Sequence, residues 1–213
     1  MPQRFLPLVT NQFYHIFNRG TEKRTIFESS RDYNRLIKSM SYYQIQGPKP
    51  SFSKFFQPKT LNIDFSKKIV DILVYCFMPN HFHLLIKQVK DGGLSEFMSK
   101  VSNSYTKYYN TKYDRVGPLL QGEFKAVLIE SDEQLVHVSR YIHLNPLVSN
   151  LVKELLDYPW SSYKEYINNT TGVCSKDEIL SFFRSFKDYQ DFILDHASYA
   201  QELEFIKHKL IED

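Results

Sequence analysis

The chain has 213 residues, of which 42% are hydrophobic, and a mean hydropathy of −0.40, so it can bury a real core and wholesale disorder is excluded. Its 27 basic and 24 acidic residues leave a formal charge of +3, which permits a nucleic-acid partner without requiring one. Two cysteines, Cys76 and Cys174, provide neither a disulfide framework nor a zinc-type Cys-x-x-Cys pair. No apolar run resembles a signal peptide or reaches the ~20 residues of a membrane span, so we expect a cytoplasmic protein.

The first third of the chain predicts a strand followed by a helix. The strand covers Phe13–Asn18 and ends at Arg19-Gly20, and the apolar spacing of Asp32–Tyr43 is typical of an amphipathic helix. The stretch Gln44–Lys68 is rich in Pro, Ser, Lys and Phe and predicts a long loop.

A hairpin, a helix, a strand and a final helix are predicted next. The hairpin joins Ile69–Met78 to His81–Val89 through a turn at Pro79-Asn80. The following elements are a helix from about Leu94 to Tyr113, a strand at Phe124–Ile129, and a helix capped by Ser131 that runs to about Asn145. The order β-α-β-β-α-β followed by a helix predicts an α+β, ferredoxin-like antiparallel sheet. Helical segments predicted within Lys176–Leu210 belong to a C-terminal tail.

His81-Phe82-His83 is the sharpest local signal for chemistry. Residues two apart on a strand share a face, so His81 and His83 project together while Phe82 points to the opposite side. Two imidazoles on one rigid element make half of a metal site. A pair of this kind also arises by chance, so the motif is suggestive when taken alone.

A second constellation lies on the predicted final helix. Leu135, Val138 and Ile142 form its buried stripe, and Tyr141 and Asn145, four residues apart, lie together on one flank of that stripe. Taken alone, Tyr141 also fits a tyrosine at the edge of the core, and Asn145 before Pro146 also fits a helix terminator.

In this order and separation, the two constellations resemble the HUH-type single-tyrosine transposases, and among them the REP-associated tyrosine transposases. Shorter segments between Phe13 and Tyr166 support the resemblance: Tyr14-His15-Ile16-Phe17-Asn18-Arg19-Gly20, Arg115-Val116-Gly117-Pro118-Leu119-Leu120-Gln121 and Tyr158-Pro159-Trp160-Ser161-Ser162-Tyr163. The resemblance implies a catalytic domain over residues 1–146, with a loop insert at 44–68, and a helical extension over 147–213.

The resemblance also implies an activity and a set of site residues. Tyr141 would be the nucleophile that cleaves and rejoins single-stranded DNA through a 5′-phosphotyrosine, and His81, His83 and Asn145 would hold a divalent metal. Mg²⁺ or Mn²⁺ suits two imidazoles and an amide oxygen with open positions, and the nitrogen ligands favour manganese in affinity. The expected partner is single-stranded DNA, with a hairpin at the element or repeat end as one candidate form, and a monomer is favoured over a homodimer.

Basic residues near aromatic ones are candidates for contact with DNA, because unpaired bases stack on aromatic rings while Lys and Arg follow the phosphates. The aromatic cluster comprises Tyr105, Tyr108, Tyr109 and Tyr113 on the second helix. The basic candidates are Arg19, Lys23, Arg24, Lys107, Lys112, Arg115 and Lys125.

Two other functions compete with strand transfer. The first is a catalytically silent nucleic-acid-binding module, because ferredoxin-like sheets also serve as RNA platforms. The second is a metal-dependent phosphodiesterase that uses water, in which Tyr141 would be dispensable and no covalent adduct would form.

Overall fold

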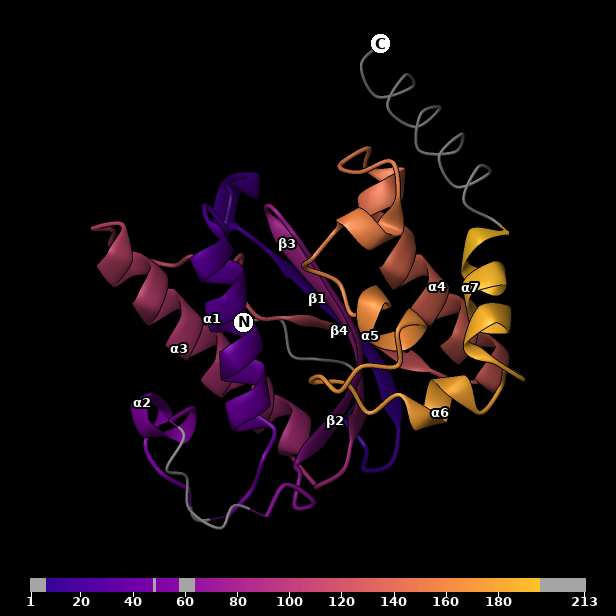
Figure 1. The fold of residues 1–213 in the computed structure, drawn as a ribbon. Helices are drawn as coiled ribbons and strands as arrows, with labels where there is room; N and C mark the ends of the chain where they lie inside the picture. Colours follow the sequence, from indigo (N-terminus) through magenta and orange to yellow (C-terminus); the bar gives the residue numbers. More distant parts are fainter. Residues whose placement is uncertain (1–6, 48, 58–63, 196–213) are drawn as a thin grey trace.

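Four antiparallel strands form the sheet at the centre of the computed structural model, which describes residues 7–47, 49–57 and 64–195 (Figure 1). The strands are β1 (Phe13–Arg19), β2 (Val70–Met78), β3 (His81–Gln88) and β4 (Lys125–Ile129). Their order in the sheet is β2-β3-β1-β4, so the first and third strands lie at the centre. This order confirms the predicted ferredoxin-like arrangement, and the strand bounds agree with the predicted ones to within one residue.

Helices cover both faces of the sheet, which gives three layers (Figure 1). One face carries α1 (Ser30–Tyr43) and α3 (Gly93–Lys112), and the other carries α4 (Asp132–Val148). The remaining helical segments are η1 (Thr21–Lys23), α2 (Phe52–Phe55), η2 (Leu155–Asp157), α5 (Tyr163–Ile167), α6 (Asp177–Leu180) and α7 (Phe186–Leu194). Within the described ranges, no helix is long and apolar enough to span a membrane.

The alternation of side chains along β3 separates the two cores. Phe82, Leu84 and Ile86 are buried against the α1–α3 layer, as the period of two predicts. Leu85 is buried in the second core, on the side that α4 covers. His81 and His83 share that second side, so the sheet presents both imidazoles toward the α4 layer.

Helix α4 begins as predicted but ends later. The Ser131 hydroxyl accepts a hydrogen bond from the backbone N–H of Gln134 at 3.1 Å, which caps its first turn. The predicted end near Asn145 is wrong, because the helix continues through Pro146 to Val148. Pro146 has no backbone N–H to donate to the helix, but only two helical residues follow it, and it is buried.

The segment after α4 packs onto the edge strand β2. The carbonyl of Trp160 accepts a hydrogen bond from the backbone N–H of Phe77 at 2.9 Å, and the hydroxyl of Tyr166 donates to the carbonyl of Leu73 at 2.8 Å. The predicted helical extension therefore shares a core with the sheet over its described part, and α6 and α7 confirm its helical segments there. The predicted helix beyond residue 195 lies outside the described residues, and the division at residue 146 stays a prediction.

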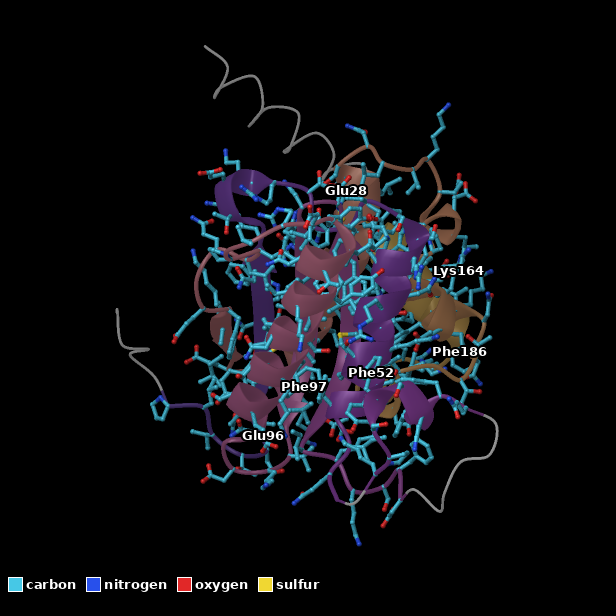
Figure 2. The ribbon with its side chains drawn as sticks, turned by 90° about the vertical axis from the view of Figure 1, so that its left-hand side faces the viewer. Glu28, Phe52, Glu96, Phe97, Lys164 and Phe186 are labelled. Carbon is cyan, nitrogen blue, oxygen red and sulfur yellow. The ribbon has the colours of Figure 1, made fainter. Side chains whose placement is uncertain are left out.

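The predicted loop Gln44–Lys68 contains one turn of helix, α2, and an isolated bridge between Ile45 and Lys68 pairs its two ends. Figure 2 faces α1 and α3, with Phe52 of α2 near one end of α1 and Glu28 toward the other. The Arg35 guanidinium lies 3.9 Å from the centre of the Phe52 ring, so the insert packs on the α1–α3 layer.

One buried carboxylate fastens α1 to α3. Asp32 is fully buried and accepts hydrogen bonds from the hydroxyls of Tyr108 at 2.9 Å and Tyr113 at 2.7 Å, and from the ammonium of Lys112 at 2.6 Å. Burial acts to raise the pKa of Asp32, but the hydrogen bonds from Lys112, Tyr113, Tyr108 and Ser29 outweigh it, so the pKa lies below its usual value.

Replacing Asp32 by Asn should lower the free energy of unfolding by about 3 kcal/mol at neutral pH, because Lys112 loses its partner and the amide cannot accept every bond. Because the folded pKa of Asp32 is lowered, its contribution is present above the unfolded pKa of ~3.9 and is lost as the pH falls below it. Urea denaturation should therefore show a gap between wild type and Asp32→Asn that narrows below about pH 4. Asp91→Asn, at an exposed turn, is the control, and an equal loss in both variants would contradict this role.

Candidate active site

A cavity of about 580 Å³ lies where the ends of β1 and β3 meet α4. It is lined by residues of both central strands, of β4, of the loops and turns beside these strands, and of α4: Phe17, Asn18, Arg19, Lys23, Asn80, His81, His83, Gln121, Glu123, Lys125 and Tyr141. The structure thus brings together the predicted nucleophile, Tyr141, and both predicted metal-binding histidines.

The register of the central strands places the two histidines. His83 lies opposite Phe17 and His81 opposite Arg19 on the antiparallel neighbour β1. The two imidazole centres are 5.1 Å apart and the ring planes are nearly perpendicular. His83 is buried, with 7% of its surface exposed, and His81 is half-buried, so both are screened by protein yet border the cavity.

Each of the two imidazoles uses its Nδ1 atom in a hydrogen bond within the protein. His81 Nδ1 lies 2.6 Å from the Asn80 side-chain oxygen, which can only accept, so this Nδ1 carries the proton. The Asn80 amide nitrogen donates to the carbonyl of Lys23 at 3.3 Å, which fits that orientation of the amide. His83 Nδ1 lies 3.0 Å from Nε2 of His15 on β1.

Burial keeps these rings neutral near pH 7. Desolvation, with smaller contributions from the neighbouring His15 and His81, lowers the pKa of His83 to about 3. Desolvation also lowers the pKa of His15 to about 4, and desolvation together with Arg19 lowers that of His81. A neutral imidazole has a lone pair to give to a metal, so this electrostatic environment suits ligation.

Tyr141 lies at the mouth of the cavity. About half of the side chain is exposed, and its ring stands edge-on to His83, with 5.5 Å between ring centres, and to His15, with 5.8 Å. Helix α4 fixes this position because Leu135 and Ile142 of its apolar stripe are buried against the sheet. The predicted placement of Tyr141 on the flank of that stripe is confirmed.

Asn145 lies one turn after Tyr141. In the part of the chain that the structure describes, it is not one of the residues that line the cavity. Its amide nitrogen donates to the carbonyl of Tyr141 at 2.7 Å, which leaves the amide oxygen as the atom that a metal would use. Its role as a ligand stays a prediction.

The donor set fits a divalent metal in an open site. Two neutral imidazoles that donate through Nδ1 would offer two Nε2 lone pairs, which are ordinary ligands for Mn²⁺ and weaker ones for Mg²⁺. The described residues contain no cluster of three or more His, Cys, Asp or Glu side chains that would form a closed cage. His81 and His83 would therefore hold the ion, with Asn145 as the predicted third ligand.

The predicted DNA-contacting residues fall on two faces of the sheet. Arg19, Lys23 and Lys125 border the catalytic cavity. Lys107 and Lys112 line a second cavity of about 800 Å³, on the α1–α3 side of the molecule.

Two of the basic candidates, Arg24 and Arg115, bond to side chains that are close to them in the sequence. The Arg24 guanidinium pairs with Glu22 at 3.3 Å, and the Arg115 guanidinium donates to the Asn110 side chain at 3.0 Å. Whether either contacts DNA stays a prediction.

Two of the tyrosines of α3 cannot belong to the expected stacking platform. Tyr105 and Tyr109 are buried, and their hydroxyls donate to the carbonyls of Ile26 and Thr25. The prediction that these two rings stack on unpaired bases is wrong, because the α1–α3 interface needs them as core residues.

His15 and Asn80 bond to the two predicted metal-binding histidines, and the sequence patterns did not single out either of them. In the sequence analysis, His15 appears only inside the family motif Tyr14–Gly20, and Asn80 appears only as a turn residue. A histidine on the strand paired with His81-Phe82-His83, on the same face, is the signal that would have indicated His15. His143, within the tyrosine motif, is buried and structural, with ring nitrogens bonded to the hydroxyls of Ser162 and Tyr189.

Comparisons with known proteins agree with this geometry. Residues 59–145 match the family model described as "Transposase IS200 like". Among solved structures, a REP-associated tyrosine transposase bound to a REP hairpin has a similar fold, with a TM-score of 0.57, 15% sequence identity, and coverage of 79% of this chain and 86% of that chain. No curated protein matches the chain.

The matched residues 59–145 include His81, His83, Tyr141 and Asn145. The structural match covers 79% of the chain. The family match and the fold thus agree with the resemblance to the single-tyrosine transposases that the motifs indicate.

Proposed function

We propose that this protein cleaves and rejoins single-stranded DNA through a covalent 5′-phosphotyrosine formed on Tyr141. The single observation that carries the proposal is the position of Tyr141, which stands edge-on to His83 at the mouth of the cavity that His81 and His83 also line. The match to the IS200-like transposases supports DNA as the substrate.

In the proposed reaction, the Tyr141 oxygen forms a bond to phosphorus and the bond from phosphorus to the 3′ oxygen breaks. The phenol gives up its proton, and the departing 3′ oxygen takes one up to become a free 3′-OH. A divalent ion held by His81 and His83 would withdraw negative charge from the phosphate. The phosphotyrosine conserves the bond energy, so a 3′-OH can reverse the step without ATP.

The chain's own residues supply the rest of the site. The exposed face of Tyr141 admits the substrate, while the buried stripe of α4 holds the ring in place. Arg19, Lys23 and Lys125 border the cavity and provide positive charge where a phosphate would enter. Arg19 also bonds the Gln121 side chain at 2.5 Å, which orders the guanidinium at the rim.

Tyr141→Phe should abolish the covalent adduct while leaving the fold and DNA affinity nearly unchanged, because it removes the nucleophilic oxygen and keeps the ring. The measurement is a denaturing gel after incubation of the protein with Mn²⁺ and single-stranded DNA from the flanks of its own gene. Tyr14→Phe, whose hydroxyl accepts a hydrogen bond from the Val9 backbone on the far side of the sheet, is the control and should still form adduct. DNA cleavage without adduct in wild type would instead indicate a phosphodiesterase that uses water.

Two substitutions distinguish a role of Asn145 as a metal ligand from a role in ending the helix. Asn145→Asp should keep or tighten Mn²⁺ binding by adding charge, whereas Asn145→Ala should weaken it, as should His81→Ala and His83→Ala, each by ~10-fold or more. Calorimetry with Mn²⁺ measures all four variants. Unchanged affinity in both Asn145 variants, together with a loss in both histidine variants, would leave the two histidines as the site and remove Asn145 from it.

Single-stranded DNA binding should weaken with salt, because protein cations that neutralise phosphates release counterions. Lys125→Glu, at the catalytic cavity, and Lys107→Glu, at the α1–α3 cavity, should each lower affinity across sequences. The slope of log K against log salt should become shallower by ~0.7 for each phosphate that the variant no longer neutralises. Lys153→Glu, at an exposed position after α4, is the control. If Lys107→Glu behaves like Lys153→Glu while Lys125→Glu weakens binding, the DNA follows the catalytic face alone.

A further inference from the structure

The rings of His15 and His83 meet across the two central strands. His15 pairs with Leu85 and Phe17 pairs with His83, so His15 and His83 are diagonal neighbours on one face of the sheet. Their rings are stacked, with centres 5.2 Å apart and planes 24° apart, and Nε2 of His15 lies 3.0 Å from Nδ1 of His83. This contact is a hydrogen bond between two imidazoles, and it needs one proton between the two nitrogens.

Only one of the two possible positions of that proton is compatible with a metal on His83. If His15 donated, Nδ1 of His83 would be the acceptor, and the proton of a neutral His83 would lie on Nε2. That proton would block the Nε2 lone pair. If His83 Nδ1 donates to His15 Nε2, the His83 Nε2 lone pair is available to a metal.

The same assignment determines what His15 can do. A neutral His15 that accepts through Nε2 carries its own proton on Nδ1, so both of its nitrogens are committed. His15 is therefore not a third ligand while this bond exists. Its effect on a metal passes through His83.

The neighbouring histidine shows the same arrangement independently. His81 Nδ1 donates to the Asn80 side-chain oxygen, which leaves its Nε2 lone pair available. With His83 as the donor, each member of the His81–His83 pair would have its own acceptor at Nδ1, one from the turn before β3 and one from β1.

We propose that His15 is a positioning residue that accepts the Nδ1 proton of His83 and so fixes His83 in the tautomer and ring orientation that can bind a metal. The inference rests on the proposed function for the identity of the metal site, but the tautomer itself is a property of the metal-free protein.

The test is nitrogen NMR of the metal-free protein labelled with ¹⁵N-histidine, combined with Mn²⁺ calorimetry. In wild type, His83 should be protonated at Nδ1 and His15 at Nδ1, with both Nε2 atoms unprotonated. His15→Phe keeps a ring but removes the acceptor, so the Nδ1 preference of His83 should be lost and Mn²⁺ affinity should fall ~10-fold or more. His15→Gln places an amide oxygen at a similar reach and should restore both.

Asn80→Ala is the matched control, because it removes the acceptor of His81 and should change the tautomer of His81 alone. Wild-type His83 protonated at Nε2, or an unchanged His83 tautomer and Mn²⁺ affinity in His15→Phe, would overturn the proposal. The wild-type spectrum decides the matter even if His15→Phe does not fold. Absence of Mn²⁺ binding in wild type, with His83 protonated at Nδ1, would instead contradict the proposed metal site and leave the hydrogen bond in place.

Discussion

The antiparallel register between β1 and β3 is the constraint on which the site depends. It places Phe17 opposite His83 and Arg19 opposite His81, and the alternation of a strand then puts His15, His81 and His83 on one face. A shift of one residue along β1 would turn His15 into the α1–α3 core and bring Tyr14 or Ile16 beside the imidazoles. The buried side chains of Tyr14 and Ile16 oppose that shift, so packing on one face of the sheet fixes the chemistry on the other.

The two faces of the sheet differ in what their polar groups do. On the α1–α3 side, the Asp32 carboxylate and the hydroxyls of Tyr105 and Tyr109 fasten helices and loops. On the α4 side, apolar residues of α4 pack on the sheet, and Tyr141 of the same helix borders the cavity. Because Tyr141 stands on the flank of this helix, it can be half exposed without loss of helix packing.

Burial without charge is the main electrostatic feature of the site. The histidine rings have lowered pKa values because protein covers them, and the positive charge of Arg19 lowers the pKa of His81 further. Arg19, Lys23 and Lys125 supply the positive charge that borders the cavity. Neutral imidazoles suit the binding of a metal ion, and the positive charge at the border of the cavity suits the binding of an anionic phosphate.

The sequence by itself determined the element order, the strand bounds, the His81–His83 pair and the flank position of Tyr141, because each depends on local spacing within one strand or helix. Only the tertiary structure decided that His15 reaches His83, that Tyr105 and Tyr109 are buried, and that the basic residues divide between two faces. Those facts depend on which strand lies beside which and in what register, and on which helix face the sheet covers. Interactions between residues far apart in the sequence set these relations, and no local periodicity contains them.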